Sequence, residues 1–166
     1  MAGLSATVTV VDVDYADPGH ARALLDLLDH YARDPAGGGQ GLRPEVLAGL
    51  VPALAARPTA FSVLAFEGGE AVGLVNCFEG FSTFAARPLV NVHDVVVRDT
   101  HRGRGIAERM LERVEALARA RGACKLTLEV LSGNAPALRV YERAGFAAYA
   151  LDPAIGTARF LQKSLA

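Results

Sequence analysis

The sequence feature that most constrains this chain is an apolar segment that enters a helix through a glycine-containing turn. Residues 95–97 are all valine, residues 98–101 form a charged turn, and the run Arg102-Gly103-Arg104-Gly105-Ile106-Ala107 follows. Residues 108–121 have the apolar spacing of an amphipathic helix. In such a strand–turn–helix, free backbone N–H groups and the helix dipole together favour an anion. Because the glycines allow close approach and the two arginines add positive charge, the segment predicts a site for phosphate or diphosphate.

The residues in and after this turn narrow the kind of ligand. The turn has neither the lysine and Ser/Thr of a P-loop nor the three glycines of a dinucleotide-binding turn. It reads Arg102-x-x-Gly105-x-Ala107, and a predicted strand over 124–131, then Asn134, and then Tyr141-x-x-x-Gly145-Phe146 come after it. Over roughly residues 70–150, this order resembles the GCN5-related N-acetyltransferase (GNAT) superfamily.

The resemblance implies an α/β (α+β) fold class and the GNAT fold, in which a mixed, mostly antiparallel central sheet splays between strands four and five. Helices are then expected on both faces of the sheet. The patterns along the chain predict the order β-α-α-β-β-β-α-β-α-β-β. The resemblance implies that these elements form a single N-acetyltransferase (GNAT) domain over residues 1–166. Asp17 is the expected cap of the first helix, and Gly68-Gly69 predicts a two-residue hairpin. The expected strands are 7–13, 61–67, 71–79, 89–97, 124–131, 146–151 and 157–165, the helices 18–33, 44–56, 108–121 and 134–144, and the loops 34–41 and 80–87.

Composition limits the classes of partner. The chain is 51% hydrophobic and 21% charged, which is typical of globular proteins, and its net charge of −1 argues against nucleic acid as a partner. No apolar run reaches the length of a membrane span and no secretory signal is evident, so we expect a cytoplasmic protein with no membrane partner. Cys77 and Cys124 are therefore expected to be free thiols. A homodimer is left open.

The resemblance also implies a set of contacts with acetyl-CoA, the expected co-substrate. The turn from Arg102 to Ala107 would hold the diphosphate, and the main chain of Val95, Val96 and Val97 would bind the pantetheine arm. Asn134 would contact the pantetheine through its side chain, although a plain helix N-cap explains it equally well. Tyr141 would lie at the cofactor and protonate the leaving thiolate, since a phenol keeps its proton at neutral pH.

The general base has several candidates. His93 falls where one member of the family has one of two catalytic histidines, and Asn91 stands at the position of the other. Asn91 and His93 share one face of a strand, whereas Asp94 projects to the opposite face unless a β-bulge intervenes. Glu79 is a further carboxylate that would serve as base or bind a cationic amine. Each of these residues also has a plain structural explanation.

These features predict an acetyl-CoA-dependent N-acetyltransferase that acts on a primary amine of a small molecule by direct transfer. The alternatives are a non-catalytic CoA-binding module and an acetyltransferase of protein lysines or N-termini. Cys124 has no histidine near it in sequence, which disfavours an acyl-cysteine mechanism. The histidines show no metal-ligand spacing, so no metal is expected.

Overall fold

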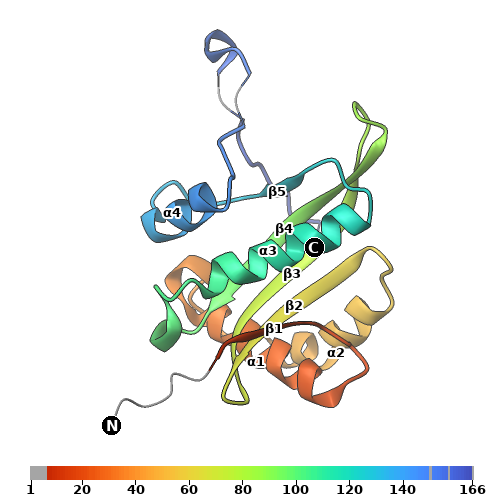
Figure 1. The fold of residues 1–166 in the computed structure, drawn as a ribbon, viewed down its shortest axis with the longest axis vertical. Helices are drawn as coiled ribbons and strands as arrows, with labels where there is room; N and C mark the ends of the chain where they lie inside the picture. Colours follow the sequence, from red (N-terminus) through yellow and green to blue (C-terminus); the bar gives the residue numbers. More distant parts are fainter. Residues whose placement is uncertain (1–6, 150, 157, 166) are drawn as a thin grey trace. The chain divides into compact units, whose positions relative to one another are not determined.

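The computed structural model describes residues 7–149, 151–156 and 158–165, and it divides the chain into two compact units, residues 1–128 and 129–166. The first unit contains a five-stranded sheet in the order β1-β2-β3-β4-β5 (Figure 1). The first four strands are antiparallel neighbours, and β4 and β5 are parallel. The strands are β1 Thr9–Asp12, β2 Ala60–Glu67, β3 Glu70–Ser82, β4 Arg87–Val97 and β5 Leu126–Leu128. This is the mixed, mostly antiparallel sheet of an α+β fold that the family resemblance implies.

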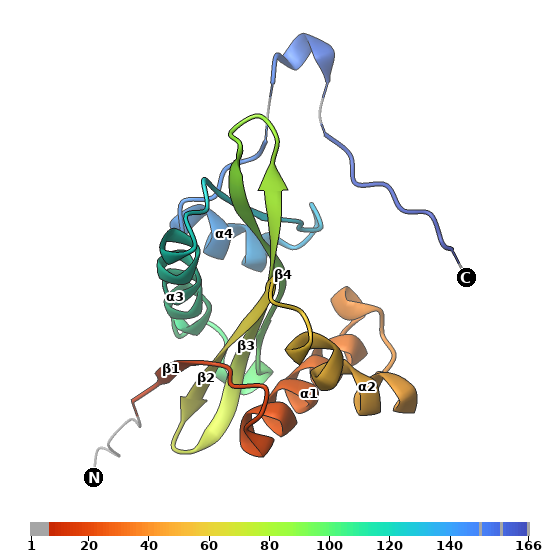
Figure 2. The same cartoon turned by 90° about the vertical axis from the view of Figure 1, so that its right-hand side faces the viewer.

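Three helices cover the sheet of the first unit. Helices α1 (Pro18–Arg33) and α2 (Pro44–Ala55) lie on one face, and α3 (Ile106–Ala120) lies on the other, as Figure 2 shows. Strand β2 is buried along most of its length because both of its faces are covered. On the α1 face, Leu24 and Leu27 are fully buried against Leu64 and Leu74 of the sheet. This layered core holds β4 in place.

Local sequence signals account for the boundaries of the first helix and the first hairpin. The Asp17 carboxylate accepts hydrogen bonds from the N–H groups of Gly19 (2.7 Å) and His20 (2.9 Å), so it caps α1 as expected. Gly68 and Gly69 join β2 to β3 with φ values of +57° and +86°, the pattern of a type I′ turn. Both predictions are confirmed.

Several expected boundaries are wrong. The β3–β4 hairpin pairs as far as Ser82 with Arg87, so the expected loop over 80–87 shrinks to residues 83–86. Backbone pairing continues along this arm although its side chains are no longer buried. Helix α3 starts at Ile106, two residues early, because Gly105 takes a left-handed conformation that turns the chain directly into the helix.

The strands predicted in the C-terminal part of the chain agree less well with the structure. Strand β5 has only three residues, since its ladder with β4 covers only Val90–Val92. Residues 146–149, 151 and 158–165 form no strand, and a short 3-10 helix, η3 (Pro153–Ile155), lies between them. An apolar pattern marks β potential, but a strand forms only where a neighbour completes its hydrogen bonds. Residues 150 and 157, which the two expected strands included, lie outside the described residues.

The second unit contributes one longer helix, α4 (Ala135–Arg143). Asn134 caps it, and Gly145 follows it with a φ of +89°, so the helix lies where the sequence predicts. Of the helices in the described part of the chain, none has the length and apolar character needed to cross a bilayer.

Candidate active site

The turn between β4 and α3 leaves open space at its two glycines. Gly103 and Gly105 both have a φ of +74°, and a Cβ at either position would meet no heavy atom within 4 Å. The N-cap of the 15-residue helix α3 is Gly105, and within the described residues no side chain makes a cap hydrogen bond there. The first N–H groups of α3 therefore lie at the positive end of the helix dipole beside free space, and this arrangement suits a phosphate.

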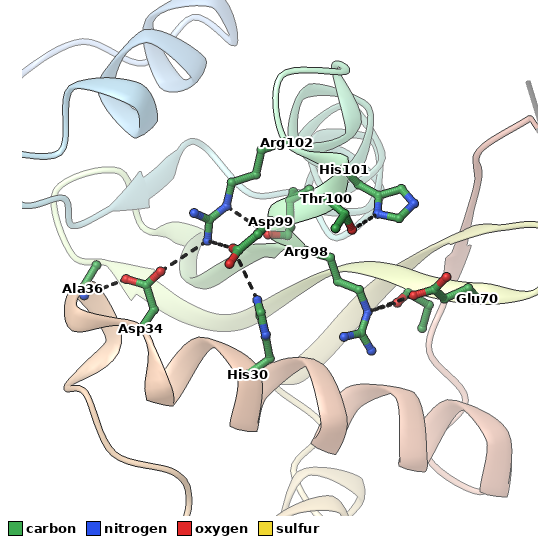
Figure 3. A network of polar contacts seen from close by, with 11 residues as sticks. His30, Asp34, Ala36, Glu70, Arg98, Asp99, Thr100, His101 and Arg102 are labelled. Carbon is green, nitrogen blue, oxygen red and sulfur yellow. Dashed lines mark hydrogen bonds and ion pairs between the residues drawn. The ribbon is translucent and has the colours of Figure 1, made fainter.

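The arginine that opens the turn is held by two carboxylates. The Arg102 guanidinium lies 2.8 Å from Asp99 and 3.4 Å from Asp34, and its Nε donates to the Val97 carbonyl at 3.2 Å (Figure 3). Asp34 follows α1, and its pKa is lowered by the N–H of Ala36 and then by Arg102. These contacts tie the end of α1 to the turn.

The second arginine of the turn is paired in the same way. Arg104 binds both carboxylate oxygens of Glu67 at the end of β2, and His101 lies 3.1 Å from the same carboxylate. The hydrogen bond from Arg104 is the main reason that the pKa of Glu67 lies below its usual value. Both arginines expected to meet the anion are thus already engaged by carboxylates, which the sequence analysis missed.

A β-bulge in β4 brings the candidate bases to one face. Asp94 pairs with Asn76 of β3, whereas the next partner, Cys77, pairs with Val92, so His93 is an extra residue. Directly paired residues share a face of the sheet, so Asp94 lies on the Asn76 face, which is the face covered by α1. The bulge that the sequence could not locate therefore moves Asp94 to the face that Asn91 and His93 occupy.

The contacts of these residues differ. The Nδ1 atom of the exposed His93 lies 3.3 Å from Asn91 Oδ1, and its ring packs edge-on against Phe78, with centroids 5.3 Å apart. Asp94 is half-buried and accepts a 3.0 Å hydrogen bond from Asn76 Nδ2. A carboxylate and an imidazole, the two common proton acceptors, are thus adjacent on one face.

Glu79 lies on the opposite face. Its pairing with Val90 puts it on the α3 side of the sheet, where its carboxylate lies 3.3 Å from Arg121. Arg121 also stacks on the Phe61 ring, 4.5 Å from its centroid. The structure does not bring Glu79 together with His93 and Asp94.

Beyond the bulge, the side of β4 that faces away from β3 pairs with no strand among the described residues. Arg98 N–H donates to Val72 of β3 at 2.9 Å, and polar groups of successive strand residues alternate in direction. The N–H and C=O groups of Val95 and Val97 therefore point away from β3, whereas those of Val96 point toward it. In the described part of the chain, the β5 ladder stops at Val92. The Val95 groups are thus on the side where a ligand could pair with the strand.

The two remaining candidates belong to the second unit. Asn134 Oδ1 accepts the Ala137 N–H at 3.2 Å, so its carbonyl oxygen serves as the helix cap. Its amide N–H groups remain the donors with which it would contact a pantetheine. Tyr141 packs edge-on against Phe146, with ring centroids 6.0 Å apart.

The sequence analysis also missed two buried polar residues beside the candidate bases. Ser62 and Asn76 are 2% and 3% exposed and form a hydrogen bond with each other at 2.6 Å. The available signal was an amide within the apolar run Leu74-Val75-Asn76-Cys77. Among the described residues, no group of three or more His, Cys, Asp or Glu side chains could hold a metal ion.

Comparisons with known proteins agree with this architecture. The model of the acetyltransferase (GNAT) family matches residues 24–146. Streptothricin acetyltransferase of Streptomyces lavendulae is 41% identical over 83 residues, 49% of this chain and 44% of that protein. L-methionine sulfoximine/L-methionine sulfone acetyltransferase of Pseudomonas aeruginosa is 34% identical over 105 residues, 63% of this chain and 56% of that protein.

The fold has solved counterparts as well. The crystal structure of a probable acetyltransferase superimposes with a TM-score of 0.78 at 21% identity and covers 94% of this chain and 98% of that one. The chain spans about half the length of the curated relatives it matches. Because the family model covers well over half of the sequence, the chain belongs to the acetyltransferase (GNAT) family.

Proposed function

We propose that this chain is an acetyl-CoA-dependent N-acetyltransferase that acetylates a primary amine of a small molecule by direct transfer. The observation that carries the proposal is the β4 bulge, which puts Asp94 beside His93 on one face just before the open turn into α3. One short segment thus offers a proton acceptor, main-chain groups for a ligand and an anion site.

The residues present fit acetyl-CoA. The open space at Gly103 and Gly105 and the uncapped N-terminus of α3 suit its diphosphate. The outward groups of Val95 suit an extended amide-containing arm such as pantetheine. When bound, acetyl-CoA supplies an activated thioester.

The proposed chemistry assigns one task to each residue. Asp94, with His93 beside it, removes a proton from the substrate ammonium or amine, directly or through a water. The Val95 N–H donates a hydrogen bond to the negative charge that develops on the acetyl oxygen. Tyr141 is proposed as the proton donor to the thiolate on the family pattern Tyr-x-x-x-Gly-Phe alone.

The relatives suggest which amines to test. Their names concern streptothricin and the amino acid analogues methionine sulfoximine and methionine sulfone, all small molecules that carry amines. A small-molecule amine is also consistent with the net charge of −1, which offers no general attraction for a polyanion.

The test is turnover with a panel of amines. The protein is incubated with acetyl-CoA and streptothricin, methionine sulfone, methionine sulfoximine or a lysine peptide, and CoA and acetylated product are quantified by mass spectrometry. We expect product with at least one small amine, and a kcat for Asp94→Asn that is lower by roughly 10²–10⁴-fold. Glu115→Gln, in α3 at the half-exposed partner of Arg119, serves as the matched control and should retain wild-type rates.

Three results would count against parts of the proposal. CoA binding without any acetylated product would indicate a non-catalytic CoA-binding module. Acetylation of the peptide alone would indicate a protein acetyltransferase. If Glu79→Gln rather than Asp94→Asn abolishes the acidic limb of the kcat/KM profile, the base is Glu79.

A further inference from the structure

Four side chains form a series of hydrogen bonds, the hydrogen-bond chain, that ends at Asp94. The Tyr15 hydroxyl lies 2.9 Å from Ser62 Oγ, and Ser62 Oγ lies 2.6 Å from Asn76 Oδ1. Asn76 Nδ2 lies 3.0 Å from Asp94 Oδ2. The four residues come from the segment before α1, from β2, from β3 and from β4, so the chain crosses three neighbouring strands.

The chemistry of the four groups fixes which group is the donor in each of these hydrogen bonds. The Asp94 carboxylate accepts hydrogen bonds only, so the Asn76 amide must present its NH₂ group to it. The Asn76 carbonyl oxygen then requires a donor, and the hydroxyl proton of Ser62 is the one within reach. Because Ser62 has a single proton, Tyr15 must donate to Ser62. Every bond in the chain therefore points its donor toward Asp94.

The hydrogen-bond chain engages only one of the two carboxylate oxygens of Asp94. The bond from Asn76 goes to Oδ2, and within the described residues no hydrogen bond or ion pair holds Oδ1. Asp94 is half-buried, whereas Ser62 and Asn76 are almost completely buried. One oxygen of the carboxylate is thus held by a buried amide, and the other is left for a substrate proton.

We propose that Tyr15, Ser62 and Asn76 are positioning residues that hold the Asp94 carboxylate in one orientation for proton removal, through the hydrogen bond that Asn76 donates to it. This inference rests on the proposed function, because it assigns the chain a role only if Asp94 is the base. Burying two polar side chains in an apolar sheet is costly unless they are fully paired, and the directed chain meets that condition.

Other titratable groups near Asp94 could also contribute to the pH dependence of kcat/KM. Tyr31 of α1 and Cys77 of β3 feel the charge of Asp94. Two further titratable groups are Tyr15, which is linked to Asp94 through Ser62 and Asn76, and His93, which precedes Asp94 in β4. Burial, and secondarily the Asp94 charge, raise the pKa of Tyr31, and burial raises the pKa of Cys77 to about 12. Of the four, only histidine normally titrates between pH 5 and 8, so His93 must be controlled for.

The experiment compares pH profiles of kcat/KM for Tyr15→Phe, Ser62→Ala and Asn76→Leu, each also made in a His93→Gln background. Loss of the Asn76 N–H removes a hydrogen bond from the ionised carboxylate, so the acidic limb should move upward by about one pH unit. Ser62→Ala should shift it in the same direction by less, and Tyr15→Phe by least. The shift should persist without His93, with KM changing less than kcat.

A matched control and a second measurement separate this inference from a folding defect. Cys77→Ala truncates a buried neighbour of Asn76 on the opposite face and should leave the acidic limb unmoved. The Asp94 carboxyl is also titrated directly by ¹³C NMR in the substrate-free protein, which reports the same shift in any folded variant. If Asn76→Leu fails to fold, Ser62→Ala and Tyr15→Phe carry the same comparison.

The outcomes distinguish the two proposals. An unmoved acidic limb and an unmoved NMR titration in an active Ser62→Ala variant overturn the inference and leave the proposed function intact. A wild-type protein that acetylates no amine overturns the proposed function. If the NMR titration of Asp94 nevertheless shifts in the variants, the hydrogen-bond chain still orders the Asp94 carboxylate but has no part in catalysis.

Discussion

Gly105 allows the anion site to be tested by a pair of isosteric substitutions. Its φ of +74° penalises any L-residue, but Asn and Asp are among the non-glycine residues that tolerate this region, and a Cβ there meets nothing within 4 Å. Gly105→Asp and Gly105→Asn therefore share the backbone strain and differ in one negative charge. Comparing the two variants isolates the electrostatic effect of that charge at the start of α3.

The size of the effect follows from Coulomb's law. One unit of diphosphate charge at about 5 Å from the new carboxylate costs roughly 3 kcal/mol at an effective dielectric constant of ~20, and about 0.8 kcal/mol in bulk water. We therefore expect CoA to bind Gly105→Asp at least tenfold more weakly than Gly105→Asn, a difference of about 1.4 kcal/mol. Without ligand the order should reverse, because a carboxylate near a helix N-terminus stabilises the helix by roughly 0.3–1 kcal/mol.

The assay is calorimetric titration with CoA at pH 7.5, together with thermal unfolding of both ligand-free variants. General damage to the fold would lower both the CoA affinity and the stability of the same variant, so it would not make Gly105→Asp the weaker binder and also the more stable protein. Equal dissociation constants in two folded variants would show that the diphosphate does not lie at this turn.

Three further predictions concern other parts of the molecule. Tyr141→Phe should lower kcat by roughly 10²–10⁴-fold with little change in CoA affinity, and a near-normal kcat under rate-limiting chemistry would show that Tyr141 only packs. Because burial raises the pKa of Cys77 to about 12, a thiol reagent at pH 8 should modify the half-buried Cys124 first and Cys77 only on unfolding, as peptide mass mapping would show. Asp17→Ala should lower the melting temperature at pH 7. Backbone hydrogen bonds depress the folded pKa of Asp17, so its contribution is present above its unfolded pKa and is lost as the pH falls through the depressed value; a deficit that persists at pH 2 would contradict the cap.

The sequence predicted well what depends on neighbouring residues. The Asp17 cap, the Gly68-Gly69 hairpin and the cap at Asn134 each follow from the preferences of a few adjacent residues, and all three are present. The glycine turn into α3 was found for the same reason, although the helix begins two residues earlier than its apolar pattern suggests.

Features that depend on distant residues were not predictable in this way. The carboxylates on Arg102 and Arg104 come from Asp34, 68 residues away, and Glu67, 37 residues away. The extra residue in β4 leaves no mark on the local pattern, because a bulge is defined by the partner strand. The chain through Ser62 and Asn76 becomes visible only when three strands lie side by side.

The paired state of Arg102 and Arg104 has a kinetic consequence for ligand capture. The carboxylates of Asp34, Asp99 and Glu67 neutralise these arginines, so the turn projects little positive potential into solution. A polyanionic ligand would then gain little acceleration from long-range attraction, and its association rate would depend weakly on ionic strength. Discrimination among anions at this turn would arise after encounter, from the fit of a diphosphate to fixed N–H donors. Free phosphate and nucleic acid, which share the charge but not the shape, would gain no general advantage from attraction at a distance.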